Sequence, residues 1–350
     1  MAGPLDGVRI IELDGLGPAP FCCMMLADHG AEILTIHRPG RPPDLRNPLT
    51  RSRQLVEADL KSAEGVEHVR SLINSADGLI EGFRPGVLER MGLAPDQLLK
   101  DNPKLVIGRM TGWGQTGPLA HAAGHDINYI GISGALDSFG RAGNKPTPPI
   151  NTVGDFGGGG MLLAFAMSAA LLKAEKTGEG DVIDCAMTEG SSLLMAMMWG
   201  FKANGQWRDE RGTNLLDTGA HFYDSYETAD GKYIALGSIE PQFYAQMLDL
   251  TGLKDDPDFE IQLNPEKWPS LKEKLAATIK TKTRDEWDNI MQGTDVCYAP
   301  VLSMSEAPDH PHNKERDAFF TLDGVMQPSP APKYQKSVTD RPQAPRPFKE

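Results

Sequence analysis

The chain has 350 residues, of which 40% are hydrophobic and 24% are charged, and its formal net charge is −13 at pH 7. This length and composition are typical of one large or two medium globular domains. The negative charge argues against a general nucleic-acid-binding protein, which needs a basic surface, but it allows a local basic patch for a small phosphorylated ligand.

We expect the chain to contain neither a targeting signal nor a membrane-spanning segment. The four cysteines, Cys22, Cys23, Cys185 and Cys297, lack metal-ligand spacing and are interpreted as reduced thiols. No secretory signal is expected in MAGPLDGVRI, and the C-terminal FKE is not a peroxisomal signal. The longest apolar run, Met161–Leu172, is too short to span a bilayer and is expected to form a buried helix. We expect a cytoplasmic protein, or a peroxisomal or mitochondrial one in a eukaryote.

Strands and helices alternate in the first part of the chain. GVRIIELDG (7–15) predicts a strand, APFCCMMLADHG (19–30) a helix that ends at a glycine, and AEILTIHRPG (31–40) a second strand. Further strands are predicted in 75–93, where a short helix follows, and in 103–117. This order predicts an α/β fold with a doubly wound parallel sheet. The first strand–helix connection lacks the GxGxxG pattern, so a dinucleotide site is poorly supported.

A second region begins near residue 205. Residues 227–253 predict a turn at ADG, then a strand and an amphipathic helix, and 271–291 predict another helix. We therefore expect a smaller α+β domain over 205–310 and a large domain built from 1–204 and 311–350.

The stretch NTVGDFGGGGMLLAFA (151–166) places Asp155 just before four consecutive glycines. A carboxylate at the start of a helix ordinarily caps it. The glycines are costly in a helix, by roughly 1 kcal/mol each relative to alanine, so something must approach the backbone closely. Two alternatives remain open: tight helix–helix packing, or a ligand whose developing negative charge is stabilised by the exposed amides.

A second polar site is GHDINYIGISG, which contains His125 and Asp126. A lone histidine is usually structural or simply exposed. Asp126 can cap a helix or set the tautomer of the neighbouring histidine.

Nearly the whole chain resembles the α-methylacyl-CoA racemases of the family III CoA-transferase superfamily. The motifs that carry the resemblance are GVRIIELDGLGPAPFCCMMLADHGAEILTIHRPG, EGFRPGVLERMGL, GRMTGWGQTGPLA, GHDINYIGISG, PPINTVGDFGGGGM, KTGEGDVIDCAMTEG and ADGKYIALGSIEPQFY. The resemblance implies the family III CoA-transferase fold, an interlocked homodimer and an acyl-CoA substrate. It implies no metal and no bound cofactor, because CoA is part of the substrate.

The resemblance also implies a mechanism, in which the C2 centre of a 2-methylacyl-CoA is inverted through an enolate. Such an inversion needs a base on one face and an acid on the other. His125 and Asp155 match the family's acid/base pair, and Glu240 matches the glutamate that orients the histidine. The amides of Gly157 and Gly158 would face the thioester oxygen.

Two further groups of residues are implied as substrate contacts. Each cation can instead be a solvated surface charge, and core packing is the alternative for most of the methionines. The CoA candidates are Arg38, Lys61, Arg84 and Arg90, and the acyl-chain candidates are Met195, Met197 and Met198.

Two other functions are weighed against the racemase. In a family III CoA-transferase, Asp155 would attack the thioester and form an acyl-aspartyl anhydride, which requires no second base at His125. In a non-catalytic CoA-binding protein, the combination of His125, Asp155 and Glu240 would have no purpose.

Overall fold

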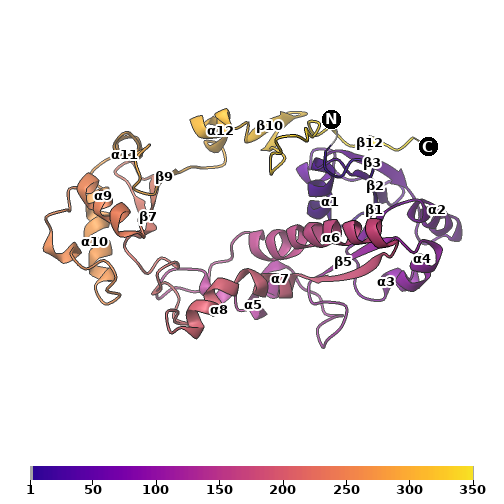
Figure 1. Cartoon of the computed structure of the whole chain (residues 1–350), viewed down its shortest axis with the longest axis horizontal. Coiled ribbons are helices and arrows are strands. Elements are labelled where there is room, and N and C mark those ends of the chain that lie inside the picture. The colour runs from indigo at the N-terminus through magenta and orange to yellow at the C-terminus, as the bar shows by residue number, and fades with distance from the viewer. Residues whose placement is uncertain (1–2, 350) are drawn as a thin grey trace. The chain divides into compact units, whose positions relative to one another are not determined.

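The computed structural model describes residues 3–349 (Figure 1). The chain forms two compact units. The larger unit contains the segment up to Ala135, Pro149–Ala196 and the segment from Asp317, and the smaller unit contains Leu136–Pro148 and Met197–Arg316.

The larger unit is built on a seven-stranded sheet in which every pair of neighbouring strands is parallel. The strand order is β12-β3-β2-β1-β4-β5-β6. The strands are β1 (Arg9–Leu13), β2 (Glu32–His37), β3 (Arg53–Glu57), β4 (Gly78–Glu81), β5 (Val106–Thr111), β6 (Asp181–Ala186) and β12 (Arg346–Pro347). The expected parallel sheet is therefore confirmed.

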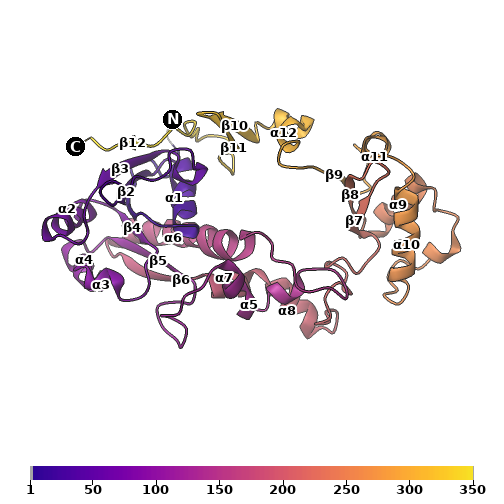
Figure 2. The same cartoon turned by 180° about the vertical axis from the view of Figure 1, so that it is seen from behind.

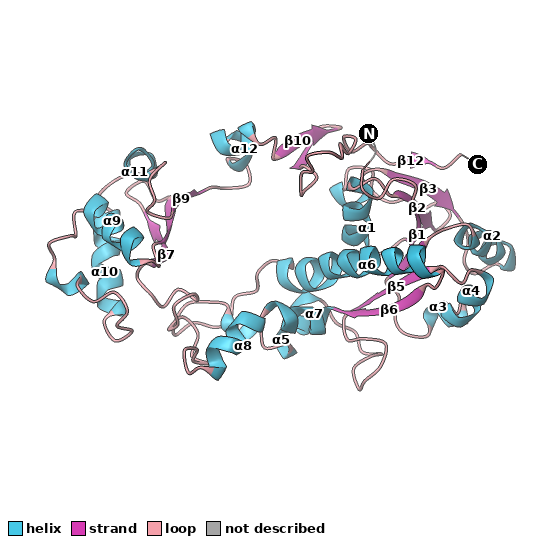
Figure 3. Ribbon diagram, viewed as in Figure 1, coloured by secondary structure: helices cyan, strands magenta, loops and turns pink. Residues whose placement is uncertain are grey.

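Helices cover both faces of this sheet (Figures 2 and 3). One face carries α1 (Pro18–Asp28) and α6 (Leu162–Thr177), and the other carries α2 (Ala63–Asn74), α3 (Val87–Arg90) and α4 (Pro95–Asp101). Successive side chains of a strand point to opposite faces. Ile10 accordingly packs with α1 and α6, whereas Ile11 packs with α2, α3 and α4. This two-sided burial accounts for the consecutive buried residues of β1, β2, β4 and β5.

Buried ion pairs join the layers. Arg53 is 1% exposed, and its Nε donates to Glu12 at 2.7 Å while its guanidinium also donates to the Pro20 carbonyl of α1. Arg109 donates to Glu81 at 2.8 Å, and Glu81 in turn accepts a hydrogen bond from the Phe83 amide. A buried charge is tolerated only when it is paired and hydrogen-bonded. These pairs therefore fix α1 and the loop after β4 at the sheet.

The C-terminal tail, which is rich in proline, contains short β-strands. Phe319–Leu322 (β10) and Val325–Pro328 (β11) form an antiparallel hairpin. Beyond it, Arg346 pairs with Gln54, so the tail returns as an edge strand beside β3. Proline is tolerated at such an edge because its missing N–H need not reach another strand.

The smaller unit combines a three-stranded antiparallel sheet with helices, as expected. Its strands are β7 (Tyr223–Glu227), β8 (Tyr233–Gly237) and β9 (Tyr298–Val301). Its helices include α9 (Pro241–Thr251), α10 (Trp268–Ile279), α11 (Arg284–Met291) and α12 (Pro311–Glu315), and α8 (Ala196–Ala203) begins at its boundary. Short 3₁₀ turns occur in this unit at Leu136–Ser138, Pro257–Phe259 and Ala307–Asp309, and the larger unit has one at Pro48–Thr50.

The bounds of the smaller unit differ from the expected range 205–310, because the unit includes 136–148 and extends over 197–316. Ion pairs account for the early segment. Arg141 pairs with buried Asp224, and Arg211 pairs with Asp137 at 2.8 Å. Such contacts between residues distant in sequence are not visible as a pattern in the chain.

The apolar segment after Asp155 is only partly buried. One stretch of the described chain, Thr152–Thr177, is long and apolar enough to cross a membrane by length and composition alone, and 39% of its most apolar window is buried. Core helices of globular domains pass the same test. Leu163 and Met167 are fully buried, but Phe165 is 71% exposed. The expectation of a fully buried helix is therefore wrong for one face of this segment.

His221 is a fully buried histidine in the core of the smaller unit. Its Nε2 lies 2.8 Å from the Tyr244 hydroxyl, and its Nδ1 has no hydrogen-bond partner among the residues that the structure describes. The rings of Phe222, Tyr244 and Phe259 surround it. Burial, aided by the charge of Lys272, lowers the pKa of His221 from 6.5 to about 4.

We predict that this ring makes the stability of the smaller unit depend on pH. The pKa is lower in the folded state than in the unfolded chain, so the stabilisation is present above about pH 6.5 and is lost as pH falls toward 4. A shift of this size corresponds to ~3 kcal/mol. In urea unfolding, the free energy of unfolding of His221→Gln should fall less steeply between pH 6.5 and 4 than that of the wild type. His121→Gln, at an exposed position, is the control; equal slopes in all three proteins would contradict the prediction.

Candidate active site

A cavity of about 680 Å³ lies in the larger unit, where β1, β4 and β5 end. Its walls come from Leu16–Ala19 after β1, Gly82–Pro85 after β4 and Met110–Trp113 at the end of β5. His125 and Asp155 both line it. Ligands of doubly wound folds bind at the carboxyl ends of the strands, so the two residues singled out in the sequence meet where a ligand is expected.

His125 stands at the start of α5 (Asp126–Ile132), at the N-cap position, with an extended backbone. Its own amide donates to the Asn128 side chain at 3.0 Å, which fixes the entry into the helix. The His125 side chain is exposed. Because it also lines the cavity, a ligand bound there can reach it.

Asp155 lies inside a π-helix, Thr152–Met161, and is not a helix cap. The N-cap is Asn151, in the left-handed region with φ 59°, and its side-chain amide donates to Asp155 Oδ2 at 2.8 Å. The Asp155 amide donates to Asp126 Oδ1 at 2.8 Å. The capping interpretation of Asp155 is therefore wrong: the carboxylate is itself held by a neighbour and points toward the cavity.

The environment raises the pKa of Asp155 above its ordinary value of 3.8. Burial is the main cause, and the negative charge of Asp126 adds to it. The hydrogen bond from Asn151 and the proximity of His125 act in the opposite direction. A carboxyl group with a raised pKa is suited to exchanging protons near neutral pH.

The consecutive glycines pack against α7 (Met187–Leu194) and α1. A Cβ at Gly158 would lie 2.6 Å from the Ser191 nitrogen, and one at Gly190 would lie 1.9 Å from the Gly158 oxygen. A Cβ at Gly160 would lie 2.6 Å from the Pro18 oxygen. Of the two alternatives, helix–helix packing accounts for these glycines. Neither Gly157 nor Gly158 lines the cavity, so their proximity to a thioester oxygen has no support in this geometry.

Of the four predicted CoA-binding cations, Arg84 lines the cavity and the other three do not. Arg38 directly follows β2, Lys61 precedes α2 and Arg90 ends α3. All four side chains are exposed. Arg84 is thus placed beside the two candidate bases, and a role for Arg38, Lys61 and Arg90 in binding CoA stays a prediction.

Met110 lines the cavity, and so does Met187; the sequence analysis missed both, although it could have found Met187. It is the first residue of α7 and follows β6 directly, and this position at a strand end was the available clue. Met195 is buried at the end of α7, whereas Met197 and Met198 belong to α8 and the smaller unit. Their contact with an acyl chain stays a prediction.

Glu240 lies in the smaller unit, at the N-cap of α9, and its side chain is exposed. An exposed carboxylate at this position is free to meet a partner outside its own helix. Its predicted hydrogen bond to His125 stays a prediction.

An aromatic pair forms another wall of the cavity. The rings of Trp113 and Tyr129 meet edge to face, with centroids 4.8 Å apart. The Tyr129 hydroxyl donates to the Gly124 carbonyl, just before His125. A Cβ at Gly112 would lie 2.1 Å from the Tyr129 ring, so glycine is required there. The pair gives the site a rigid apolar side that the sequence patterns did not reveal.

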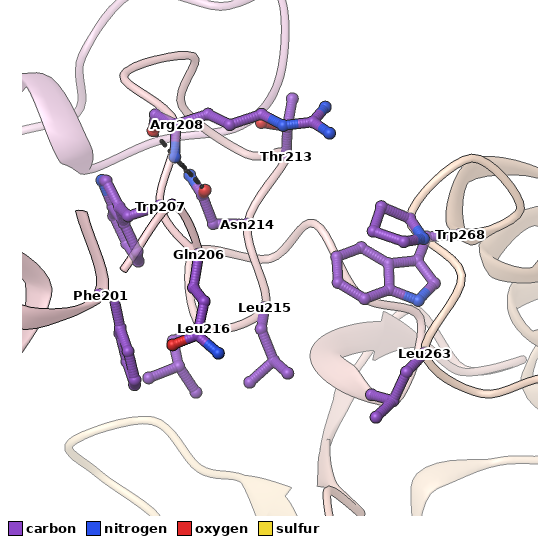
Figure 4. Close-up of a pocket in the computed structure, with 12 residues that line it drawn as sticks. Phe201, Gln206, Trp207, Arg208, Thr213, Asn214, Leu215, Leu216, Leu263 and Trp268 are labelled. Carbon is purple, nitrogen blue, oxygen red and sulfur yellow. Dashed lines mark hydrogen bonds between the residues drawn. The ribbon is translucent and has the colours of Figure 1, made fainter. Parts of the chain in front are cut away.

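The smaller unit contains a second cavity, of about 360 Å³ (Figure 4). Trp207, Leu215 and Trp268 contribute to its largely apolar lining, and Asn214 fixes one wall by accepting a hydrogen bond from the Arg208 amide at 2.7 Å. None of the described residues that line it is a histidine or a carboxylate. It therefore lacks the acid/base chemistry of the cavity in the larger unit.

Comparison with known proteins identifies the family. The model of CoA-transferase family III matches residues 5–347. The chain belongs to CoA-transferase family III. It is 45% identical over 328 residues to α-methylacyl-CoA racemase of Mus musculus, covering 94% of this chain and 85% of the mouse protein. It is 43% identical to the Homo sapiens racemase, covering 94% of this chain and 86% of the human protein.

The same family includes transferases and proteins of similar fold. Succinyl-CoA–D-citramalate CoA-transferase of Chloroflexus aurantiacus is 29% identical, with 93% of this chain and 84% of that protein covered. A CaiB/BaiF family protein of Brucella suis has the same fold, with a TM-score of 0.83 at 24% identity over 99% of this chain and 97% of that chain. The expected family III fold is thereby confirmed.

We predict that Asn151 limits how far the pKa of Asp155 rises. Asn151→Ala removes the amide that donates to the ionised carboxylate, so the pKa of Asp155 should increase further. Carbon-13 NMR titration of the aspartate carboxyl groups measures this directly. Asn144→Ala, which leaves the surroundings of Asp155 intact, is the control, and an Asp155 pKa that falls in Asn151→Ala would contradict the assignment.

Proposed function

We propose that this protein is an acyl-CoA racemase that inverts the C2 centre of 2-methylacyl-CoA thioesters. The observation that carries the proposal is that His125 and Asp155 line one cavity, at the carboxyl ends of the sheet. The similarity to the mouse and human racemases over 94% of the chain supports the same reaction.

The chemistry follows from the two groups. One base removes the C2 proton and leaves an enolate conjugated with the thioester, and the other group, protonated at the start, returns a proton to the opposite face. By resemblance to the family, His125 takes the proton of the (S) epimer and Asp155 that of the (R) epimer. The C–H bond broken and the C–H bond formed are at the same carbon, so neither an oxidant nor a cofactor is consumed.

Other side chains would bind the substrate. Arg84, beside both bases, is the cation best placed for the phosphates or adenine of CoA, with Arg38, Lys61 and Arg90 as further candidates. Met187 and the Trp113–Tyr129 pair offer an apolar surface to the acyl group. Glu240 would orient His125, as in the family.

A CoA-transferase remains the alternative, because transferases are among the relatives. In that reaction the Asp155 carboxylate displaces the CoA thiolate from the thioester and forms an acyl anhydride. The thiolate then releases the donor acid by attacking the aspartyl carbonyl, and the retained CoA is passed to the free acceptor acid, which regenerates the Asp155 carboxylate. The presence of a histidine in the same cavity favours the racemase, because anhydride formation does not require it.

We also propose that the protein acts as a homodimer. In the single chain, Phe165 is 71%, Leu193 61% and Leu194 52% exposed, on α6 and α7. Apolar side chains of this size that stay exposed in the single chain are suited to a contact with a second copy.

We predict that sedimentation equilibrium will give a mass near 76 kDa, twice the 38.1 kDa of one chain. Phe165→Glu and Leu193→Glu, which place charges on the exposed face, should shift the protein toward the monomer. Glu67→Lys, a charge change at an exposed position of α2, is the control. A stable, fully active monomer of the wild type would contradict the dimer proposal.

We predict that both bases are needed for racemisation. His125→Ala and Asp155→Ala should each lower the rate by at least 10²- to 10⁴-fold, the typical contribution of one acid/base group. Each variant should retain some exchange of the C2 proton from the face whose base survives. The measurement is deuterium incorporation at C2 from single epimers in deuterated water. Glu240→Gln should lower the rate less, because both bases remain.

The transferase alternative gives a different result in the same experiment. It requires Asp155 alone, works without His125 and depends on a free-acid acceptor. Full racemisation by His125→Ala with no acceptor present would exclude the two-base mechanism, and hydroxylamine trapping of an acyl group at Asp155 would establish the transferase.

A further inference from the structure

Asp126 connects the two candidate bases. It follows His125 directly in the chain and is the first residue of α5. Its side chain is 2% exposed, and its Oδ1 accepts the hydrogen bond from the Asp155 amide at 2.8 Å. The buried Asp126 is therefore next to His125 in the chain and hydrogen-bonded to the backbone of Asp155.

This contact is shaped for an aspartate. A Cβ at Gly154, the residue before Asp155, would lie 2.3 Å from Asp126 Oδ1 and 3.1 Å from the Ile130 side chain. Glycine at 154 therefore allows the carboxylate to reach the amide. A longer side chain at 126, or any side chain at 154, would separate α5 from the π-helix.

An ordinary capping role does not describe this geometry. A capping carboxylate accepts hydrogen bonds from the first amides of its own helix, whereas Asp126 binds an amide of another helix. Burying a carboxylate costs free energy unless it is hydrogen-bonded. The molecule bears that cost where α5, which follows His125, contacts the π-helix that carries Asp155.

We infer that Asp126 is a positioning residue, which holds the Asp155 carboxyl at a fixed distance from His125. This inference rests on the proposed racemase function. Two-base inversion requires both groups to reach the same carbon, and a displacement of about 1 Å can cost 10²-fold in rate. Asp126 does not touch the substrate; it acts through Asp155.

The charge of Asp126 adds a second effect, because it raises the pKa of Asp155. The other groups that face Asp155 are His125 and Tyr129 of α5 and Asn151 at the start of its own helix, and Arg84 lines the same cavity. Removing the charge of Asp126 while keeping an acceptor oxygen should therefore lower the pKa of Asp155 without releasing the contact.

The test compares Asp126→Ala, Asp126→Asn and a control in the same helix, Ser133→Ala, which removes a buried hydroxyl at the other end of α5. For single epimers of a 2-methylacyl-CoA, Asp126→Ala should lower kcat by about 10²-fold with KM little changed. Asp126→Asn should recover most of kcat, and the acidic limb of its pH profile should move to lower pH. Ser133→Ala should lower the melting temperature and leave kcat and the pH profile unchanged.

Hydrogen–deuterium exchange at the Asp155 amide tests the contact without the reaction. It should be faster in Asp126→Ala than in the wild type and near the wild-type rate in Asp126→Asn. An unchanged kcat in folded Asp126→Ala would overturn the inference, as would an Asp126→Asn variant that loses as much kcat as Asp126→Ala. If Asp126→Ala does not fold, the Asp126→Asn variant decides alone. The inference would be overturned if the Asp155 amide of that variant exchanges rapidly while its kcat and pH profile stay at the wild-type values. A wild type that fails to exchange C2 would instead refute the racemase function.

Discussion

The close backbone contact between the π-helix and α7 is the constraint on which the site depends. Gly158 and Gly190 approach so closely that neither position has room for a Cβ. Any side chain there would move the π-helix away from α7, and Asp155, three residues earlier, would move with it. The glycines therefore serve the chemistry indirectly, because their packing places the carboxylate at the cavity.

The π-helix itself explains how Asp155 is held. Its i→i+5 hydrogen bonding widens the turn, and the left-handed backbone of Asn151 starts it. With this start, the Asn151 side chain reaches forward to Asp155 Oδ2. Asp126, the first residue of α5, accepts a hydrogen bond from the Asp155 amide. Asp155 is thus fixed through both its side chain and its backbone, as pre-organised catalytic groups require.

The parts of the fold that the sequence predicted are those with local patterns. β1, α1 and β2 follow from apolar runs bounded by glycine, and β4 and β5 from similar runs. β3 was not recognised because Arg53 and Gln54 interrupt its apolar pattern, although Arg53 is buried by pairing with Glu12. Asp155 and His125 were singled out from their local sequence, and the family resemblance then assigned them as an acid/base pair. The contact of Asp126 with the Asp155 amide depends on how α5 packs against the π-helix, which no local pattern encodes. The contact of Asn151 with Asp155 is local, but it depends on the left-handed backbone of Asn151, which the sequence analysis did not predict.

The raised pKa of Asp155 would balance the two bases in the proposed mechanism. An ordinary aspartate and an ordinary histidine differ by about 2.6 pKa units, or about 3.5 kcal/mol for moving a proton from one to the other. A reaction that runs in both directions through one enolate is slowed by such a mismatch, because one of the two protonated forms is then rarely populated. Burial of Asp155 and the charge of Asp126 raise the aspartate pKa toward that of an imidazole. The same packing that positions the carboxylate therefore also makes its proton affinity suitable for reversible transfer.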